Sequence, residues 1–318
     1  MNIFLSIILN SIIPIFILIF LGYIIDKKFK PDMNTLTKIN FYLFVPAFSF
    51  VNIYTTDISI DLVRVIVLTA ILLAINFVFG AALSKLLRLP KKTSKAFENA
   101  LMFYNSGNIG VSLITLVFSN APFISDGMTP YLEVALSVQI MTLLVQNLTT
   151  NTIGFINSGG EGMTLKTGII RVVQMPALYA ITLAVLLKFM PFDFTVTPIW
   201  SALVYLRNGL VGIALVTLGV QLSKSKINLK MKIPYLAAVC RLIGGPALAF
   251  LLIKLFGFEG VTAQAIFIAS STPTAVNTAL LSIECKGDSE FAVQTVTVST
   301  LLSAVTMTTV VYLAYVLF

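Results

Sequence analysis

Two membrane-length segments of the chain carry polar and helix-weakening residues near their centres. The first cluster holds Asn105, Ser106, Gly107, Asn108 and Gly110, with the break expected at Ser106–Gly110, and the second is ASSTPTAVN (269–277). Glycine and proline weaken a helix, so each cluster is expected to break its segment and to free backbone N–H and C=O groups. At membrane depth such groups are tolerated only where protein buries them or where they line a wet cavity. Two half-helix N-termini pointing into one space would form an anion site without a basic side chain.

The polar residues at and near the two breaks are the candidate substrate-binding residues. They are Asn105, Ser106, Gly107, Asn108, Gln139, Gln146, Ser271, Thr272, Pro273, Thr274 and Asn277. Gln139 and Gln146 are seven residues apart and so share one face of the next predicted helix. The alternative is that both breaks are ordinary kinks, since glycine and proline are common in membrane helices. Two breaks at matching depth favour the binding site.

The half-helices need capping residues at their first turns. Asn108 or Ser106 is predicted to cap a half-helix that runs to Phe118. In the second cluster, Thr272 is predicted to be the cap and Pro273 the first helical residue, a position that suits proline.

The residue types that support catalysis or metal binding are scarce. The chain has no histidine and only two cysteines, and no pair of Asp or Glu residues falls at the centre of a predicted span. No metal, cofactor or catalytic residue is therefore expected, and an intramembrane hydrolase, which needs a nucleophile with a base or paired aspartates, is disfavoured. The sequence predicts a protein that is not an enzyme.

The composition predicts an all-α polytopic membrane protein. Of the 318 residues, 58% are hydrophobic and 11% are charged, whereas soluble domains carry about 25% charged residues. Apolar runs of about 20 residues, enough to cross a bilayer, recur along the chain. The ten predicted spans are 3–25, 36–55, 62–86, 99–118, 130–155, 168–189, 197–221, 233–256, 262–282 and 290–317.

The distribution of basic residues predicts the topology. Most of the 21 Lys and Arg residues fall in or next to the loops of one side, whereas the loops of the other side hold only Arg64, Lys188 and Lys254. This asymmetry predicts that the protein spans the cell (inner) membrane with its lysine-rich side in the cytoplasm and both termini on the outer side. The net charge of +8 therefore reflects topology, and no nucleic-acid partner is expected.

The loop NSGGEGMTLK divides the chain into two halves of five spans. The predicted units are residues 1–155, a cytoplasmic linker 156–167, and residues 168–318. An odd number of spans in each half makes the halves enter the membrane in opposite directions. Breaks at matching positions in inverted repeats are a sequence sign of a transporter site.

Arg207 and Arg241 lie inside predicted spans. Intramembrane charges are candidates for function. Each arginine is about 12–15 Å from the nearer membrane face, and helical side chains lean towards the N-terminus, which is that face for both. We therefore expect both side chains to reach the interface, with a structural role favoured over substrate binding.

The chain resembles the auxin efflux carrier family, which holds plant auxin exporters and bacterial carriers of malate, malonate and related acids. The likeness rests on IIPIFILIFLGYIIDKK and KINFYLFVPAFSF in the first two spans, NSGNIGVSL in the fourth, and GIALVTLGVQL, RLIGGPALAF and STPTAVNTALL in spans seven to nine. The resemblance implies two inverted five-helix repeats with crossing broken helices 4 and 9. It also implies an elevator mechanism, in which spans 1, 2, 6 and 7 form a scaffold, often dimeric.

One position departs from the family pattern. Ser112 stands where the family usually has a proline in the span 4 crossover, so this break is expected to be less rigid, whereas Pro273 in span 9 is kept. The short linker favours a bacterial-type organic-acid carrier over auxin export.

The expected function is that of a secondary transporter of small mono- or dicarboxylates. The expected partners are this substrate, membrane lipid, a coupling ion (proton or sodium) and a second copy of the chain. Two alternatives stay open. Broken helices can coordinate a cation through freed carbonyls, which would suit a sodium-coupled symporter, and an anion channel is also compatible with the pattern.

Overall fold

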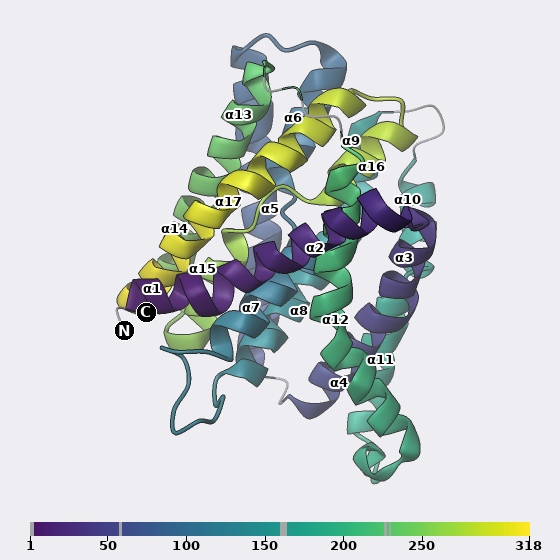
Figure 1. Ribbon diagram of the computed structural model, residues 1–318, viewed down its shortest axis with the longest axis vertical. Coiled ribbons are helices and arrows are strands. Elements are labelled where there is room, and N and C mark those ends of the chain that lie inside the picture. The colour runs from purple at the N-terminus through teal and green to yellow at the C-terminus, as the bar shows by residue number, and fades with distance from the viewer. Residues whose placement is uncertain (1–2, 57–58, 160–163, 226–227, 229) are drawn as a thin grey trace.

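The computed structural model describes residues 3–56, 59–159, 164–225, 228 and 230–318. Over these residues the chain is almost entirely helical (Figure 1). Seven continuous helices among the described residues are long and apolar enough to cross a membrane, and a pair bent by 56° makes an eighth. The chain is a polytopic all-α membrane protein, as predicted. Residues 160–163 of the predicted linker, and Lys226, lie outside the described residues.

Eight of the predicted spans correspond to these long segments, several of which contain a π-helical turn (η). They are α1–η1–α2 (Ile3–Ile7, Ile8–Ile12, Ile13–Phe29), α3–η2–α4 (Met33–Ile39, Asn40–Phe44, Val45–Thr55), α5 (Ile60–Leu86), α8–η4–α9 (Leu132–Thr149, Thr150–Gly154, Phe155–Ser158), the bent pair α10 and α11 (Leu165–Val173, Pro176–Lys188), α12 (Pro198–Ser223), α13–η6–α14 (Lys232–Val239, Cys240–Gly244, Gly245–Phe256) and α17 (Ser289–Leu317).

The other two predicted spans are interrupted, as the sequence indicates. Span 4 consists of α6 (Lys91–Met102) followed by η3 (Ser106–Gly110) and α7 (Val111–Phe118), and span 9 consists of α15 (Gly260–Ser270) followed by α16 (Val276–Glu284).

Three of the π-helical turns have a local cause in proline. Pro14, Pro46 and Pro246 each occupy the second position of the α-helix that follows η1, η2 or η6. A proline lacks the N–H that would bond four residues back, and its ring crowds that carbonyl. The wider π turn accommodates both effects without ending the helix.

The helices α2, α4, α11 and α12 pack on one another and form one group. The contact between α2 and α12 is close because glycines face it. A Cβ atom at Gly22 would lie 2.1 Å from the carbonyl oxygen of Val216, and one at Gly219 would lie 1.9 Å from that of Ile19. Small residues let membrane helices approach to this distance and gain van der Waals contact.

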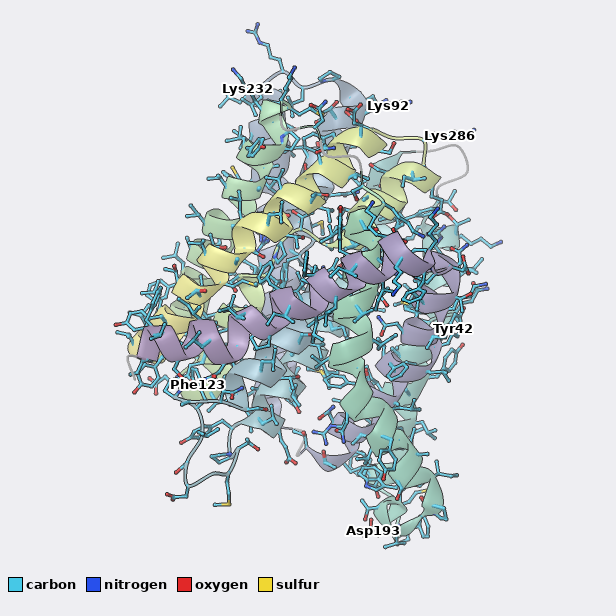
Figure 2. The ribbon with its side chains drawn as sticks, viewed as in Figure 1. Tyr42, Lys92, Phe123, Asp193, Lys232 and Lys286 are labelled. Carbon is cyan, nitrogen blue, oxygen red and sulfur yellow. The ribbon has the colours of Figure 1, made fainter. Side chains whose placement is uncertain are left out.

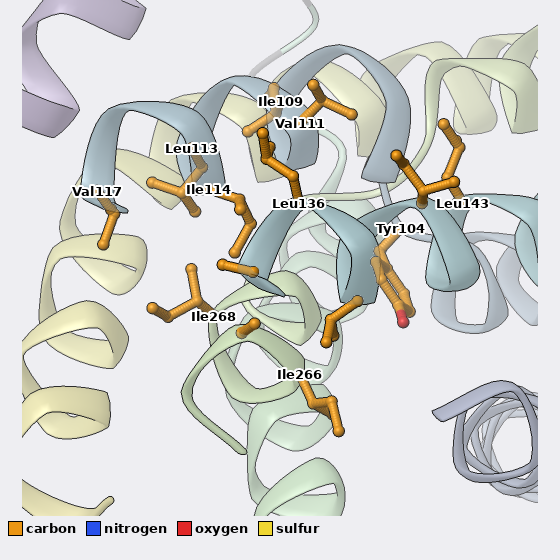
Figure 3. Close-up of a cluster of buried hydrophobic side chains, with 14 of the residues drawn as sticks. Tyr104, Ile109, Val111, Leu113, Ile114, Val117, Leu136, Leu143, Ile266 and Ile268 are labelled. Carbon is orange, nitrogen blue, oxygen red and sulfur yellow. The ribbon is translucent and has the colours of Figure 1, made fainter. Parts of the chain in front are cut away.

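A second group contains the two broken spans. Within it, α7, α8 and α15 enclose an apolar core that includes Ile114, Leu136 and Ile268 (Figure 3), all of them buried. These side chains come from both broken spans and from the intact helix between them, so their packing holds the two breaks side by side.

The two ends of the molecule differ in charge. Lys92, Lys232 and Lys286 lie towards one end, whereas Phe123 and Asp193 lie towards the other (Figure 2). The chain termini are neighbours (Figure 1): α1 contacts α17, and the rings of Phe4 and Tyr312 are 5.7 Å apart. Three of the lysine-rich loops, those next to Lys92, Lys232 and Lys286, therefore lie at the same end of the molecule.

Candidate substrate-binding site

The two broken spans meet at their breaks. After α6 ends, Phe103 is extended, and a short antiparallel bridge joins Tyr104 to Thr274. The N–H of Asn105 donates to the carbonyl of Pro273 at 2.7 Å, and the N–H of Ala275 donates to the carbonyl of Phe103 at 3.0 Å. Each break thus provides hydrogen-bond partners for backbone groups that the other break has freed. Leaving those groups unpaired inside a membrane would be energetically unfavourable.

The capping residue of the first half-helix differs from the prediction. Neither Asn108 nor Ser106 is the cap. The helix resumes at Ser106, and Asn105 caps it, with its side-chain oxygen accepting from the N–H of Asn108 at 3.2 Å. The bridge to the other span occupies Tyr104, and Asn105, which follows it, is not helical, so the helix resumes at the next residue.

The prediction for the second half-helix was also wrong. Helix α16 begins at Val276 after an extended Ala275, and Thr272 donates its hydroxyl back to the carbonyl of Ala269 at 2.9 Å instead of capping. The bridge explains this shift, because it requires the stretch from Pro273 to Ala275 to be extended. Pro273 suits this place since it contributes only its carbonyl.

A cavity of about 120 Å³ lies beside the crossing. Six of the predicted residues line it: Asn105, Ser106, Gly107, Asn108, Gln146 and Asn277. The first residues of both half-helices, Ser106 and Val276, are in its wall. The walls hold no charged side chain among the described residues.

Five predicted residues lie behind the cavity wall. Gln139 is fully buried and donates its side-chain N–H to the carbonyl of Ser106 at 2.7 Å, so it supports the start of the half-helix. Thr274 donates its hydroxyl to the carbonyl of Ala100 at 3.1 Å. Ser271, Thr272 and Pro273 complete this set and, with Thr274, lie in the segment between α15 and α16.

The opposite wall comes from the first helix group and was not predicted. The residues of span 2 and α12 on this wall are Thr37, Asn40, Phe41, Val45, Thr217 and Gln221. The remaining lining residues lie on the crossing side: Tyr104, Leu143, Asn147, Thr150, Ala275, Val276 and Leu280. Asn40 of η2 reaches across, and its amide N–H donates to the side-chain oxygen of Asn108 at 3.4 Å. Thr217 and Gln221 stand four residues apart on α12, and this helical spacing of polar residues was the available signal.

Several buried polar atoms on these walls have no hydrogen-bond partner among the described residues. They are the side-chain nitrogens of Asn105 and Gln146 and the side-chain oxygens of Asn40, Thr217 and Gln221. A buried polar group left unpaired costs about 1–3 kcal/mol. The residues that line the cavity therefore carry unpaired donors on the crossing side and unpaired polar oxygens on the opposite side.

The intramembrane arginines differ from each other. Arg207 is partly exposed, and its reach to the interface stays a prediction. Arg241 does not reach it: its side chain is fully buried, and its guanidinium donates to the carbonyls of Leu101, at 3.1 Å, and Ser270. The expectation for Arg241 was wrong because carbonyls at the ends of broken helices are acceptors that an intact span would not offer.

A profile of the family described as membrane transport proteins matches residues 7–311. The chain belongs to this family. The resemblance to the auxin efflux carriers is thereby confirmed over nearly the whole sequence. An uncharacterized transporter of Methanothermobacter thermautotrophicus is 23% identical over 308 residues, which are 94% of this chain and 95% of that protein. An uncharacterized transporter of Methanocaldococcus jannaschii is 29% identical over 110 residues, 34% of this chain and 36% of that protein.

Family membership makes Ser112 of interest. Its hydroxyl donates to the carbonyl of Asn108 at 2.7 Å, inside the continuous helical segment that follows the crossing. The break in this membrane transport protein lies before that segment, at Phe103–Asn105. Hydrogen bonds to span 9, the other broken span, hold it in place. A proline at position 112 is therefore not needed to produce it.

Proposed function

We propose that this membrane transport protein is a secondary transporter that carries small organic anions, mono- or dicarboxylates, through the cavity at the crossing. The observation that carries the proposal is the pair of unpartnered amide nitrogens, those of Asn105 and Gln146, in a cavity wall that contains the starts of two half-helices. Such helix ends favour negative charge. A carboxylate placed there would pair with donors that otherwise stay unsatisfied.

Neutral donors suit transport better than a lysine or arginine would. A carrier must bind its substrate and then release it, and a desolvated full charge pair can be too strong for release. Hydrogen bonds from neutral groups to a carboxylate contribute roughly 1.5–3 kcal/mol each, so two or three of them give moderate affinity.

The opposite wall supports a substrate that is polar at both ends. The oxygens of Asn40, Thr217 and Gln221 suit a hydroxyl group, a protonated carboxyl or a water-linked second carboxylate. A cavity of about 120 Å³ suits a compact molecule. These features favour malate- or malonate-like acids over an auxin-like acid with an aromatic ring.

The helix packing supports an elevator mechanism. One group (α2, α4, α11 and α12) packs on itself and corresponds to spans 1, 2, 6 and 7, while both broken spans belong to the other group. We propose that each broken span crosses the membrane once, which gives ten crossings in two inverted repeats, 1–155 and 168–318, with the lysine-rich end in the cytoplasm. The first group would be the scaffold through which the chain dimerises.

Binding and counterflow test this proposal. Purified protein is titrated with malonate, malate, acetate and indole-3-acetate, and proteoliposomes loaded with the bound acid are assayed for exchange with and without a sodium gradient. We expect saturable binding of a small dicarboxylate and saturable counterflow. Stimulation by the gradient would identify a sodium-coupled symporter, and flux that does not saturate would identify a channel. Absence of binding by all four acids would contradict the proposed substrate class.

A further inference from the structure

Arg241 joins the two broken spans from a helix that belongs to neither. It lies in η6, and its guanidinium donates to the carbonyl of Leu101, near the end of α6, and to that of Ser270, the last residue of α15. The last carbonyls of a helix lack partners within the helix and carry a partial negative charge. One positive group thus pairs with the C-terminal ends of both half-helices that lead into the crossing.

The sequence RLIGG provides the space for this arrangement. A Cβ atom at Gly245 would lie 2.0 Å from the Nη2 atom and 2.4 Å from the Cζ atom of Arg241, whereas one at the adjacent Gly244 would meet nothing within 4 Å. Any larger residue at 245 would push the guanidinium away. Gly245 therefore has a role that Gly244 lacks, although both are in the same turn.

The guanidinium also contacts the wall of the cavity. Its Cζ atom lies 4.8 Å from the centroid of the Tyr104 ring, which is a cation–π geometry. Tyr104 lines the cavity, and its N–H donates to the side-chain oxygen of Gln146 at 3.2 Å. Tyr104 therefore links the buried charge, through its ring, and Gln146, through its main-chain N–H, at the cavity wall.

We propose that Arg241 is a positioning residue: a fixed internal cation that holds α6 and α15 at the crossing and, through Tyr104, sets the geometry of the anion site. Without it, two sets of carbonyls of the same partial charge would face each other with no counter-charge. The predicted effect of Arg241 on substrate binding rests on the proposed function. The effect on the crossing is independent of any substrate.

The test compares Gly245→Ala with Gly244→Ala in the full-length protein. Both changes add one methyl group to the same turn, but only the first displaces the guanidinium. Hydrogen exchange without substrate is measured at the amides of Asn105 and Ala275, which form the bridge. We expect exchange at these amides to be about tenfold faster or more in Gly245→Ala, with exchange in α2 and α12 unchanged, and to be unaltered in Gly244→Ala. Equal exchange in the two variants would overturn the proposal.

Arg241→Lys serves as a second variant in case Gly245→Ala fails to fold. A lysine keeps the charge but cannot form the planar fork to two carbonyls. We expect the same local increase in exchange at Asn105 and Ala275. A variant that exchanges like the parent would show that the fork does not hold the crossing.

Malonate affinity separates this inference from the proposed function. We expect Gly245→Ala to bind malonate about tenfold more weakly than Gly244→Ala. If the parent does not bind malonate but the exchange difference is seen, the substrate class fails and the positioning role stands. If the parent and all variants bind malonate equally and exchange equally, the positioning role fails and the proposed function stands.

Discussion

The main-chain N–H of Asn105 donates a hydrogen bond to the carbonyl of Pro273 at 2.7 Å, and this bond joins the two broken spans. The same asparagine caps the following half-helix through its side-chain oxygen, while its side-chain nitrogen has no partner among the described residues. One residue therefore joins the two spans, caps the helix and carries an unpaired donor in the cavity wall.

Thr217→Val tests the opposite wall of the cavity. Valine has nearly the shape of threonine but no hydroxyl, and the Thr217 oxygen has no partner among the described residues. Removing it deletes at most one neutral hydrogen bond to the substrate, about 0.5–1.5 kcal/mol. We expect malonate to bind roughly two- to tenfold more weakly, with acetate affinity unchanged, in titrations of purified protein. An equal loss for both acids would show that Thr217 does not contact the second polar group.

Gly219→Ala tests the close packing of α2 on α12. The added methyl group would meet the carbonyl oxygen of Ile19 at 1.9 Å, so the helices must separate. Overpacking of this kind costs about 1–3 kcal/mol, and we expect a lower temperature of thermal unfolding in detergent. Gly212→Ala on the same helix meets nothing within 4 Å and is the matched control. Equal unfolding temperatures for the two variants would contradict the packing argument.

Single cysteines test the orientation in the membrane. Lys92→Cys and Asp193→Cys, each in a background without Cys240 and Cys285, place a thiol at opposite ends of the molecule (Figure 2). The charge asymmetry predicts that an impermeant thiol reagent added outside intact cells labels position 193 and spares position 92. Rapid labelling of position 92 from outside would reverse the proposed topology.

The sequence predicted that these two spans are broken, but the break expected at Ser106–Gly110 lies at Phe103–Asn105, and the starts of the half-helices were not predicted. Asparagine, glycine and proline at the centre of an apolar segment weaken a helix locally, and that effect can be read from the residues alone. The start of each half-helix depends on the backbone pairing of Asn105 with Pro273 and of Ala275 with Phe103. This pairing joins distant parts of the chain, so local capping preferences could not reveal it.

The site residues of the first helix group were missed for a similar reason. Asn40 and Thr217 are small polar residues within predicted spans, and such residues commonly serve packing between helices. Their position on the cavity follows from how the two groups of helices face each other. Arg241 was assigned to the interface because its preferred direction is towards the nearer membrane face. The freed carbonyls of Leu101 and Ser270 hold it inside instead.

Carboxylate binding by Asn105→Asp tests the central claim most directly. Aspartate has the shape of asparagine and keeps the oxygen that caps the helix, so the fold and the crossing are preserved. It replaces the free amide donor with a negative charge, which removes a hydrogen bond worth roughly 1.5–3 kcal/mol and adds repulsion. We predict that malonate binds roughly ten- to a hundredfold more weakly. The elution profile and the unfolding temperature of the variant should be unchanged. A correctly folded Asn105→Asp protein that binds malonate as tightly as the parent would show that the crossing is not the anion site.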